Sequence, residues 1–192
     1  MSSARLGPIS YIVLGLLALR GPSTPYQLKR AVSRSVGNFW PVPHSQFYKE
    51  PPRLVGAGLL SEEREASGRH RRVYALSAAG REALEAWLRT PVTTPLAVHD
   101  LGELQLFFSE LVDEVAVGAL AAAQVAAHRA LVARYRAFAA HNQARPFTEP
   151  RMAPLALGLR LAETALGFWE EVAASPPRAD AAAAAPPEAG AG

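Results

Sequence analysis

The stretch Leu59–Ser77, LLSEEREASGRHRRVYALS, decides the fold. The helical spacing of apolar residues that precedes it gives way to a spacing of two, so Leu59–Glu65 and Arg69–Leu76 are predicted to be strands. Ala66-Ser67-Gly68 between them supplies small residues and a glycine, which are typical of a turn. The stretch therefore predicts a β-hairpin with a basic tip, Arg69-His70-Arg71-Arg72.

Three short helical segments are predicted before the hairpin, from Pro8, from Pro25 and from about residue 46. Pro8 and Pro25 each fit the first helical position, where the missing N–H has no intrahelical partner to lose. Thr24 is a suitable N-cap for the second segment, with Tyr26, Leu28 and Val32 directed inward. His44 or Ser45 is the expected cap of the third segment, which ends near Gly56.

A fourth helix, Ala78–Arg89, follows the hairpin, with Ser77 as its cap and Leu84, Trp87 and Leu88 as its apolar stripe. The order of three helices, a hairpin and a closing helix is that of a winged helix-turn-helix. In this arrangement the third helix enters the DNA major groove and the hairpin lies along the phosphates. Residues 1–92 are therefore predicted to form a DNA-binding domain.

The charge distribution agrees with a nucleic-acid partner for the first half of the chain. Residues 1–90 hold thirteen Lys and Arg against six Asp and Glu, whereas residues 91–192 hold seven against eleven. The net charges are +7 and −4, so a basic module is joined to one with a different task. The chain has no cysteine, which excludes disulfides and thiolate chemistry. The short apolar runs and the absence of a signal-peptide cleavage pattern lead us to expect a cytoplasmic protein without a membrane partner.

Several short strings together resemble the PadR family of bacterial transcriptional regulators over about residues 9–89. They are Val13-Leu14-Gly15-Leu16-Leu17-Ala18, Gly21-Pro22, Tyr26-Gln27-Leu28-Lys29-Arg30, Ser45-Gln46-Phe47-Tyr48, Arg53-Leu54, Gly58-Leu59-Leu60, Gly68-Arg69 and Arg72-Val73-Tyr74-Ala75-Leu76-Ser77-Ala78-Ala79-Gly80-Arg81. The order and spacing of these strings are more specific than any one of them. The resemblance implies a transcriptional regulator, and it alone favours a repressor over an activator.

The chain from residue 96 to 174 is predicted to be all helical. Helices are expected over Val98–Leu111, from the cap Asp113 to about His141, and over Met152–Ala173. Along the last helix a heptad seam consists of Leu155, Leu159, Ala162, Leu166 and Trp169. A second stripe, Leu157, Leu161, Thr164 and Phe168, occupies another face, so this helix needs partners on two sides.

The helical region resembles the C-terminal domain of the larger PadR-like regulators, which makes the homodimer in that family. We therefore predict a mainly α fold with a small β-hairpin, consisting of an N-terminal winged helix-turn-helix and a C-terminal helical dimerisation domain. The seam is assigned to the dimer interface. Residues 175–192, rich in Ala and Pro, are predicted to be a disordered tail.

Candidate DNA contacts fall on three elements. They are Lys29 on the second helix; His44, Ser45, Gln46, Tyr48, Lys49 and Arg53 on the third; and Arg69, His70 and Arg71 at the hairpin tip. Gln suits a bidentate contact with adenine, whereas Ser, Tyr and cationic side chains usually contact phosphates. The alternatives are a solvated turn for the tip, a packing role for Tyr48 and an ordinary surface charge for Lys29.

The third helix departs from the family pattern at Pro51-Pro52, where relatives carry helix formers and an inward leucine. Neither proline can donate a hydrogen bond, so the carbonyls of Phe47 and Tyr48 lose their partners at about 3 kcal/mol or more per proline. We expect a helix that kinks or divides here. A kink tolerated through the anchors on both sides is the favoured outcome.

The predicted function is a homodimeric, ligand-responsive repressor that binds a near-palindromic DNA operator. Its small-molecule effector is not identified. Trp40, Trp87 and Trp169 could line a ligand pocket, but the helical spacing of Trp87 and Trp169 makes them expected core or interface anchors instead. The His residues lack metal-site spacing, and the chain shows no arrangement typical of an enzyme, so no metal, cofactor or catalysis is expected. The alternative is a winged helix that binds an acidic protein partner.

Overall fold

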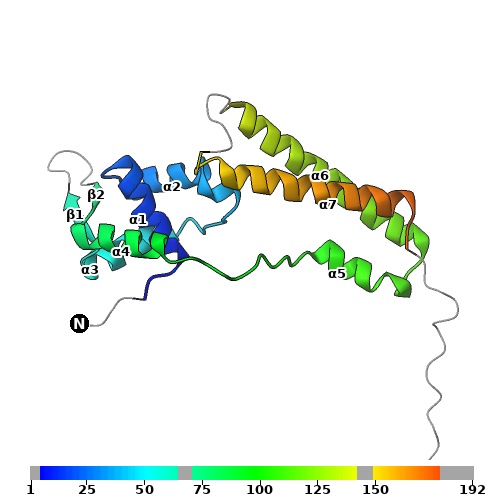
Figure 1. Ribbon diagram of the computed structural model, residues 1–192, viewed down its shortest axis with the longest axis horizontal. Helices are drawn as coiled ribbons and strands as arrows, with labels where there is room; N and C mark the ends of the chain where they lie inside the picture. Colours follow the sequence, from blue (N-terminus) through cyan, green and yellow to red (C-terminus); the bar gives the residue numbers. More distant parts are fainter. Residues whose placement is uncertain (1–4, 65–70, 142–148, 178–192) are drawn as a thin grey trace, which may run out of the picture. The chain divides into compact units, whose positions relative to one another are not determined.

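The computed structural model describes residues 5–64, 71–141 and 149–177 of the 192-residue chain. Contacts divide the chain into two units, Met1–Thr94 and Pro95–Gly192, each with its own hydrophobic core. Figure 1 shows helices as the main component of both units and the one hairpin in the first.

The first unit has the element order that the sequence predicts. It consists of α1 (Pro8–Arg20), α2 (Pro25–Ser33), the short 3-10 helix η1 (Val36–Asn38), α3 (Gln46–Gly56), β1 (Leu60–Arg64), β2 (Arg72–Leu76) and α4 (Ala78–Arg89). The predicted fold class, a winged helix-turn-helix in a mainly helical chain, is confirmed. Its core is formed by side chains from all four α-helices and both strands, among them Leu14, Leu28, Phe47, Leu54, Leu60, Tyr74 and Leu84.

Two predicted helix caps are present. The Thr24 hydroxyl accepts a hydrogen bond from the Gln27 N–H at 3.3 Å, and the Ser77 hydroxyl accepts one from the Gly80 N–H at 3.0 Å. Two inward assignments were wrong: Tyr26 and Leu88 are exposed, because each lies on the solvent side of its helix. On the predicted stripes Leu28, Val32 and Leu84 are buried, while Trp87 is 41% exposed and its ring stacks on that of Tyr11.

The hairpin strands pair antiparallel, with Leu60 opposite Leu76 and Arg64 opposite Arg72. The predicted turn and the first residues of the predicted second strand lie in 65–70, outside the described residues. A bridge between Ser23 and Tyr74 adds a third backbone segment, with N–H to carbonyl distances of 2.9 and 3.0 Å in the two directions. This bridge joins the turn after α1 to the hairpin.

Gly80 lets α4 approach the residue that precedes β1. A Cβ atom at this position would lie 2.1 Å from the carbonyl oxygen of Leu59 and 2.9 Å from a methyl group of Leu76. Relief of this clash would require displacement of the Leu59 backbone, which is energetically costly, so the close contact requires glycine at position 80. Gly15 on α1 is a suitable comparison, because a Cβ there would meet nothing within 4 Å.

We expect Gly80→Ala to lower the free energy of unfolding by about 1–3 kcal/mol, since the added methyl overpacks the contact with Leu59. Gly15→Ala, the matched control, should be neutral or stabilising by up to about 1 kcal/mol through helix propensity. Denaturant unfolding of both variants measures this difference. Equal stability of the two variants would show that α4 does not depend on the close approach.

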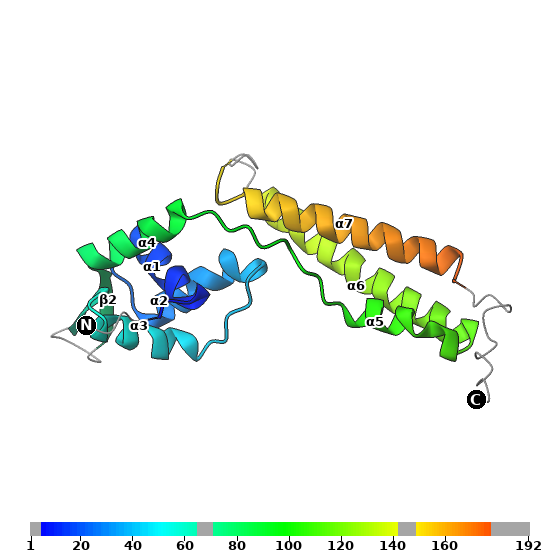
Figure 2. The ribbon, with the colours of Figure 1, turned by 60° about the horizontal axis from the view of Figure 1, so that its bottom comes forward.

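The second unit consists of α5 (Leu101–Phe107), the 3-10 helix η2 (Ser109–Leu111), α6 (Glu114–His141) and α7 (Ala153–Ala174). Asp100 caps α5 by accepting from the Gly102 N–H at 2.6 Å, and Asp113 accepts from the Ala116 N–H at 2.8 Å, as predicted for the start of α6. Figure 2 shows α6 and α7 side by side. Their ion pairs, Arg129–Glu170 at 2.6 Å and Arg136–Glu163 at 2.8 Å, show that the two helices are antiparallel.

The heptad seam of α7 packs inside the chain. Leu155, Ala162 and Trp169 are buried, while Leu159 and Leu166 are half-buried. Within one chain α6 already covers much of this seam, so the assignment of the seam to the dimer interface stays an untested prediction for which little of the seam is exposed. The α6 residues buried in the unit are Val117, Ala121, Val125 and Val132.

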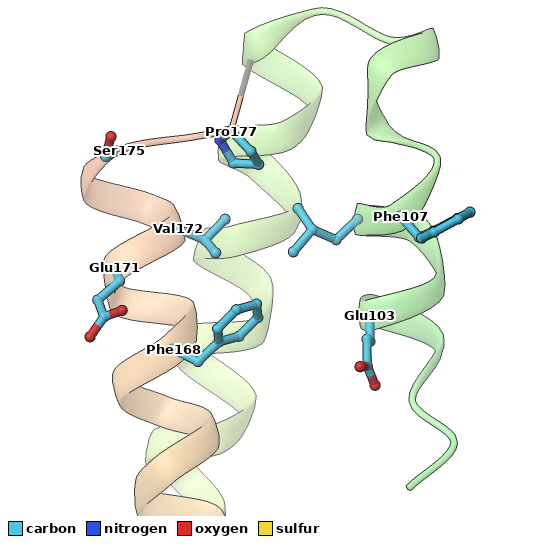
Figure 3. A pocket seen from close by; sticks show the side chains of 8 residues that line it. Glu103, Phe107, Phe168, Glu171, Val172, Ser175 and Pro177 are labelled. Carbon is cyan, nitrogen blue, oxygen red and sulfur yellow. The ribbon is translucent and has the colours of Figure 1, made fainter. Parts of the chain in front are cut away.

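Among the described residues, most of the second stripe of α7 and most apolar side chains of α5 lack such cover. Leu157, Leu161 and Phe168 are each more than two-fifths exposed. A mostly apolar pocket of about 580 Å³ lies between α5 and the last turns of α7, and Figure 3 shows Phe168 projecting from α7 toward α5. The helix predicted over 98–111 begins only at Leu101, and most of its apolar side chains are exposed; these are Leu101, Leu104, Phe107, Phe108 and Leu111.

By length and composition alone, α6 would suffice to cross a membrane. Two of its arginines, Arg129 and Arg136, form ion pairs with α7 on the exposed surface of the helix pair. Charged groups placed in hydrocarbon are costly. Within the chain only 17% of the apolar stretch of α6 is buried, so α7 covers one stripe of it and leaves the rest exposed.

Candidate nucleic-acid interface

The N-terminal half of α3 has buried apolar side chains on its inner face and exposed polar side chains on its outer face. Phe47, Pro51 and Leu54 point into the core, which fixes the inner face of the helix. Tyr48 is 57% exposed, so it is not a core residue as its packing alternative required. Lys49 is exposed beside it.

His44, Ser45 and Gln46 lead into the same end of α3. His44 and Ser45 are exposed and Gln46 is half-buried. The expected side-chain cap is absent: Ser45 has helical dihedrals and its hydroxyl makes no capping bond. The first N–H groups donate instead to backbone carbonyls three residues earlier, such as Gln46 to Pro43 at 3.0 Å. The Ser45 hydroxyl therefore stays available to an external acceptor such as a phosphate.

The two prolines do not divide α3, which is a single helix from Gln46 to Gly56. Pro51 is fully buried and Pro52 is half-buried, so the rings themselves contribute to packing. Of the two outcomes expected from the sequence, division of the helix did not occur. The missing N–H groups still leave the carbonyls of Phe47 and Tyr48 without their usual helical partners.

An ion pair spans the two prolines. Glu50 precedes them and Arg53 follows them, and the Arg53 Nε and Nη2 atoms donate to the Glu50 carboxylate at 3.0 and 2.6 Å. Two parallel bonds of this kind are the strong, geometrically specific form of the Arg–carboxylate contact. The pair joins the two halves of α3 by side chains where the backbone bonds are lacking.

Ser10 of α1 connects this pair to the first helix. Its buried hydroxyl donates to Glu50 Oε1 at 2.6 Å and accepts from Arg53 Nη2 at 3.0 Å. The hydrogen bond from Arg53 holds the pKa of Glu50 below its ordinary value of 4.5, against the opposing effect of burial. Glu50 is therefore ionised at neutral pH, and the network fixes α3 on α1.

Arg53 was a predicted DNA contact, but in the structure its guanidinium donates hydrogen bonds to the Glu50 carboxylate and the Ser10 hydroxyl. Its side chain is still partly exposed, but a phosphate would have to compete with a bidentate carboxylate. Neither Ser10 nor Glu50 was singled out in the sequence. A serine and a glutamate forty residues apart give no local pattern that would have linked them.

On the hairpin, Arg71 is exposed, whereas Arg69 and His70 lie outside the described residues. Arg64 and Arg72 both approach the Glu62 carboxylate at 3.5 Å, one from each strand. One carboxylate thus lies between two arginines, and the described end of the hairpin remains basic. Lys29 is half-buried on α2, outside the group formed by residues 44–49.

Comparison with known proteins finds similarity to PadR-like transcriptional regulators. The sequence profile described as "Transcriptional regulator PadR-like family" matches residues 13–86. The negative transcriptional regulator PadR of Bacillus subtilis is 28% identical over 102 residues, which cover 52% of this chain and 56% of that protein. The chain thus spans about half the length of this curated relative.

Solved structures share the fold along most of the chain. The crystal structure of Bacillus subtilis PadR in complex with operator DNA has a TM-score of 0.78 at 22% identity, and the match covers 88% of this chain and 98% of that one. The virulence activator AphA of Vibrio cholerae has a TM-score of 0.67 at 26% identity, with 86% and 96% covered. The PadR-like transcriptional regulator BC1756 of Bacillus cereus has a TM-score of 0.73 at 17% identity, with 86% and 96% covered.

We expect Glu50→Gln to lower the free energy of unfolding by about 1–3 kcal/mol at neutral pH, because Arg53 and Ser10 lose a charged partner. A carboxylate whose pKa is lowered by folding stabilises the fold above its unfolded pKa, and this contribution disappears as pH falls through the folded value. The difference between wild type and Glu50→Gln should therefore shrink below about pH 4.5. Denaturant unfolding from pH 7 to pH 3 measures it.

Glu85→Gln on α4 is the matched control. Glu85 forms an exposed pair with Arg89 at 3.1 Å, which should contribute at most about 1 kcal/mol. A stability difference for Glu50→Gln that stays constant down to pH 3 would exclude the ionised carboxylate as the stabilising group.

Proposed function

We propose that the chain, whose residues 13–86 match the PadR-like family of transcriptional regulators, is a sequence-specific DNA-binding protein that acts as a homodimer in the cytoplasm. The observation that carries this proposal is the exposed polar end of α3, residues 44–49, presented on a rigid base of buried Phe47 and Pro51. Direct readout of DNA requires such a helix end, with side chains that reach base edges and phosphates. The family is one of regulators and not of enzymes.

In this proposal each exposed group has a distinct task. Gln46 contacts the edge of one base, adenine being its best partner. His44, Ser45, Tyr48 and Lys49 hold the adjacent phosphates. Arg71, together with Arg69, His70 and Lys29, contributes the sequence-independent attraction of cations to the backbone. Arg53 is a positioning residue that keeps α3 in place through Glu50.

The dimer interface is proposed to lie on the second stripe of α7 in place of the buried seam. Leu157, Leu161 and Phe168 are exposed along one side of a 22-residue helix, and α5 adds further exposed apolar side chains. An apolar surface of this extent is uncommon on a monomer and typical of an interface. A second copy supplies a matching face, because a twofold axis brings the same residues together.

A repressor with a near-palindromic operator and a small-molecule effector is the finer form of the proposal. The Bacillus subtilis relative is a negative regulator, and the structure of that protein has also been determined with p-coumaric acid. AphA, by contrast, is an activator, so the direction of control has to be measured. A reporter gene behind the selected operator distinguishes the two, since deletion of a repressor raises expression.

A winged helix that binds an acidic protein partner is the second candidate, and the basic hairpin is the feature that favours it. Selection of bound sites from a pool of random duplexes decides between the two. Enrichment of one motif supports the DNA-binding regulator, whereas recovery of unselected sequences at all salt concentrations supports the protein-interaction module.

Gln46→Ala should cost about 1–3 kcal/mol of discrimination at one base pair of the selected operator. Arg71→Ala should instead weaken binding to every duplex and reduce the salt slope by about one unit. Titration of the operator and of single-base variants at several salt concentrations separates the two effects. Arg89→Ala, an equal loss of charge on the exposed side of α4, is the control and should change neither. Identical profiles for Gln46→Ala and Arg71→Ala would remove Gln46 from the base-reading group.

Leu157→Gln combined with Leu161→Gln should shift the protein from dimer to monomer, because both polar side chains would be buried in the proposed interface. Glutamine keeps the helix propensity of α7 high, so the helix should persist. Sedimentation velocity measures the oligomeric state. The matched control is Leu19→Gln with Leu88→Gln, two exposed leucines of the first unit. A double variant on α7 that remains a dimer would place the interface elsewhere.

A further inference from the structure

One face of the hairpin changes from apolar to charged as the strands leave the domain core. Side chains alternate along a strand, so this face consists of Leu60, Glu62 and Arg64 on β1 and of their partners Leu76, Tyr74 and Arg72 on β2. Leu60 and Tyr74 are buried, Glu62 is half-buried, and both arginines are exposed. The face therefore points toward the core at its base and ends in two arginines that lie directly opposite each other.

These two arginines share one carboxylate. Glu62 Oε1 lies 3.5 Å from Arg64 Nε and 3.5 Å from Arg72 Nε, and within the described residues neither arginine has another ion pair. The other ion pairs in the described parts of the chain are closer, from 2.6 to 3.1 Å. Like charges directly opposite each other on a hairpin are destabilising, so a single carboxylate at this distance leaves the pair incompletely neutralised.

Tyr74 keeps Glu62 on the hairpin from the core side. Burial raises the pKa of the Tyr74 phenol, so its hydroxyl stays protonated and can donate to Glu62 while it accepts from Arg72. A DNA phosphate has two free oxygens, and each can accept from one guanidinium in a charge-assisted bond of about 2.7–2.9 Å. A phosphate would therefore satisfy both arginines better than the distant carboxylate does.

We propose that Arg64 and Arg72 bind one phosphate of the DNA backbone, and that Glu62 competes with this phosphate. In the free protein Glu62 holds the two guanidinium groups, and in the complex the phosphate replaces it. Glu62 thus limits the sequence-independent part of DNA binding, which does not distinguish an operator from other duplexes. This inference rests on the DNA-binding function proposed above and adds to it a phosphate site between the hairpin tip and the core.

Binding of a random-sequence duplex to the full-length protein, followed by fluorescence anisotropy at several salt concentrations, tests the competition. Glu62→Gln should tighten binding about three- to tenfold, because the two arginines lose their internal partner. Arg64→Gln combined with Arg72→Gln should weaken binding and reduce the salt slope by about one unit, since one phosphate contact is lost. In this double-arginine background Glu62→Gln should have no further effect.

Glu63→Gln is the matched control. It removes the same charge from the same strand, but its exposed side chain lies on the opposite face, so affinity should change by less than about twofold at physiological salt. Equal effects of Glu62→Gln and Glu63→Gln would overturn the proposal, because the carboxylate would then act through net charge alone. Tightening by Glu62→Gln that persists without the two arginines would overturn it for the same reason.

Tripolyphosphate tests the phosphate site without DNA. In NMR titrations of the full-length protein the Nε–H resonances of Arg64 and Arg72 should shift together, and in Glu62→Gln they should shift at lower tripolyphosphate concentration. If no duplex is bound but these shifts occur, the proposed function fails and the phosphate site stands. If a duplex is bound without coupling between Glu62 and the arginines, the site fails and the function stands. Absence of both duplex binding and these shifts would overturn both.

Discussion

The placement of α3, the proposed DNA-contacting helix, depends on the Glu50 carboxylate. Two prolines in the middle of α3 lack the backbone N–H groups that would donate to carbonyls four residues earlier, so backbone hydrogen bonds alone do not hold the helix together there. A carboxylate is stable at a buried position only when it is paired. Arg53 and Ser10 satisfy it from beyond the prolines and from α1, and this requirement fixes both the halves of α3 and its seat in the domain.

What the sequence predicted well depends on contacts between close neighbours in the chain. The Thr24 and Ser77 caps bond three residues ahead, and the hairpin pairs adjacent strands, so composition and spacing suffice. The bridge of Ser23 to Tyr74 and the bond of Ser10 to Glu50 join residues tens of positions apart. No local rule relates such pairs, and for this reason the support of the candidate site was missed although its exposed face was predicted.

The heptad seam of α7 shows a second limit of pattern reading. A repeat of Leu155, Ala162 and Trp169 requires an apolar partner, but the pattern is the same whether the partner belongs to the same chain or to another copy. Here α6 is that partner, and the pair Arg129–Glu170 helps to set its register. The observation that α7 has two apolar stripes remained valid, since one is covered within the chain and the other is exposed.

The division of charge between the units separates two tasks of the chain. The first 90 residues carry +7 and the rest carry −4, so a DNA polyanion would be attracted to the first unit and repelled by the second. This asymmetry would favour an approach of DNA to α3 and the hairpin, and it leaves the apolar surface of the second unit to contacts that do not depend on DNA.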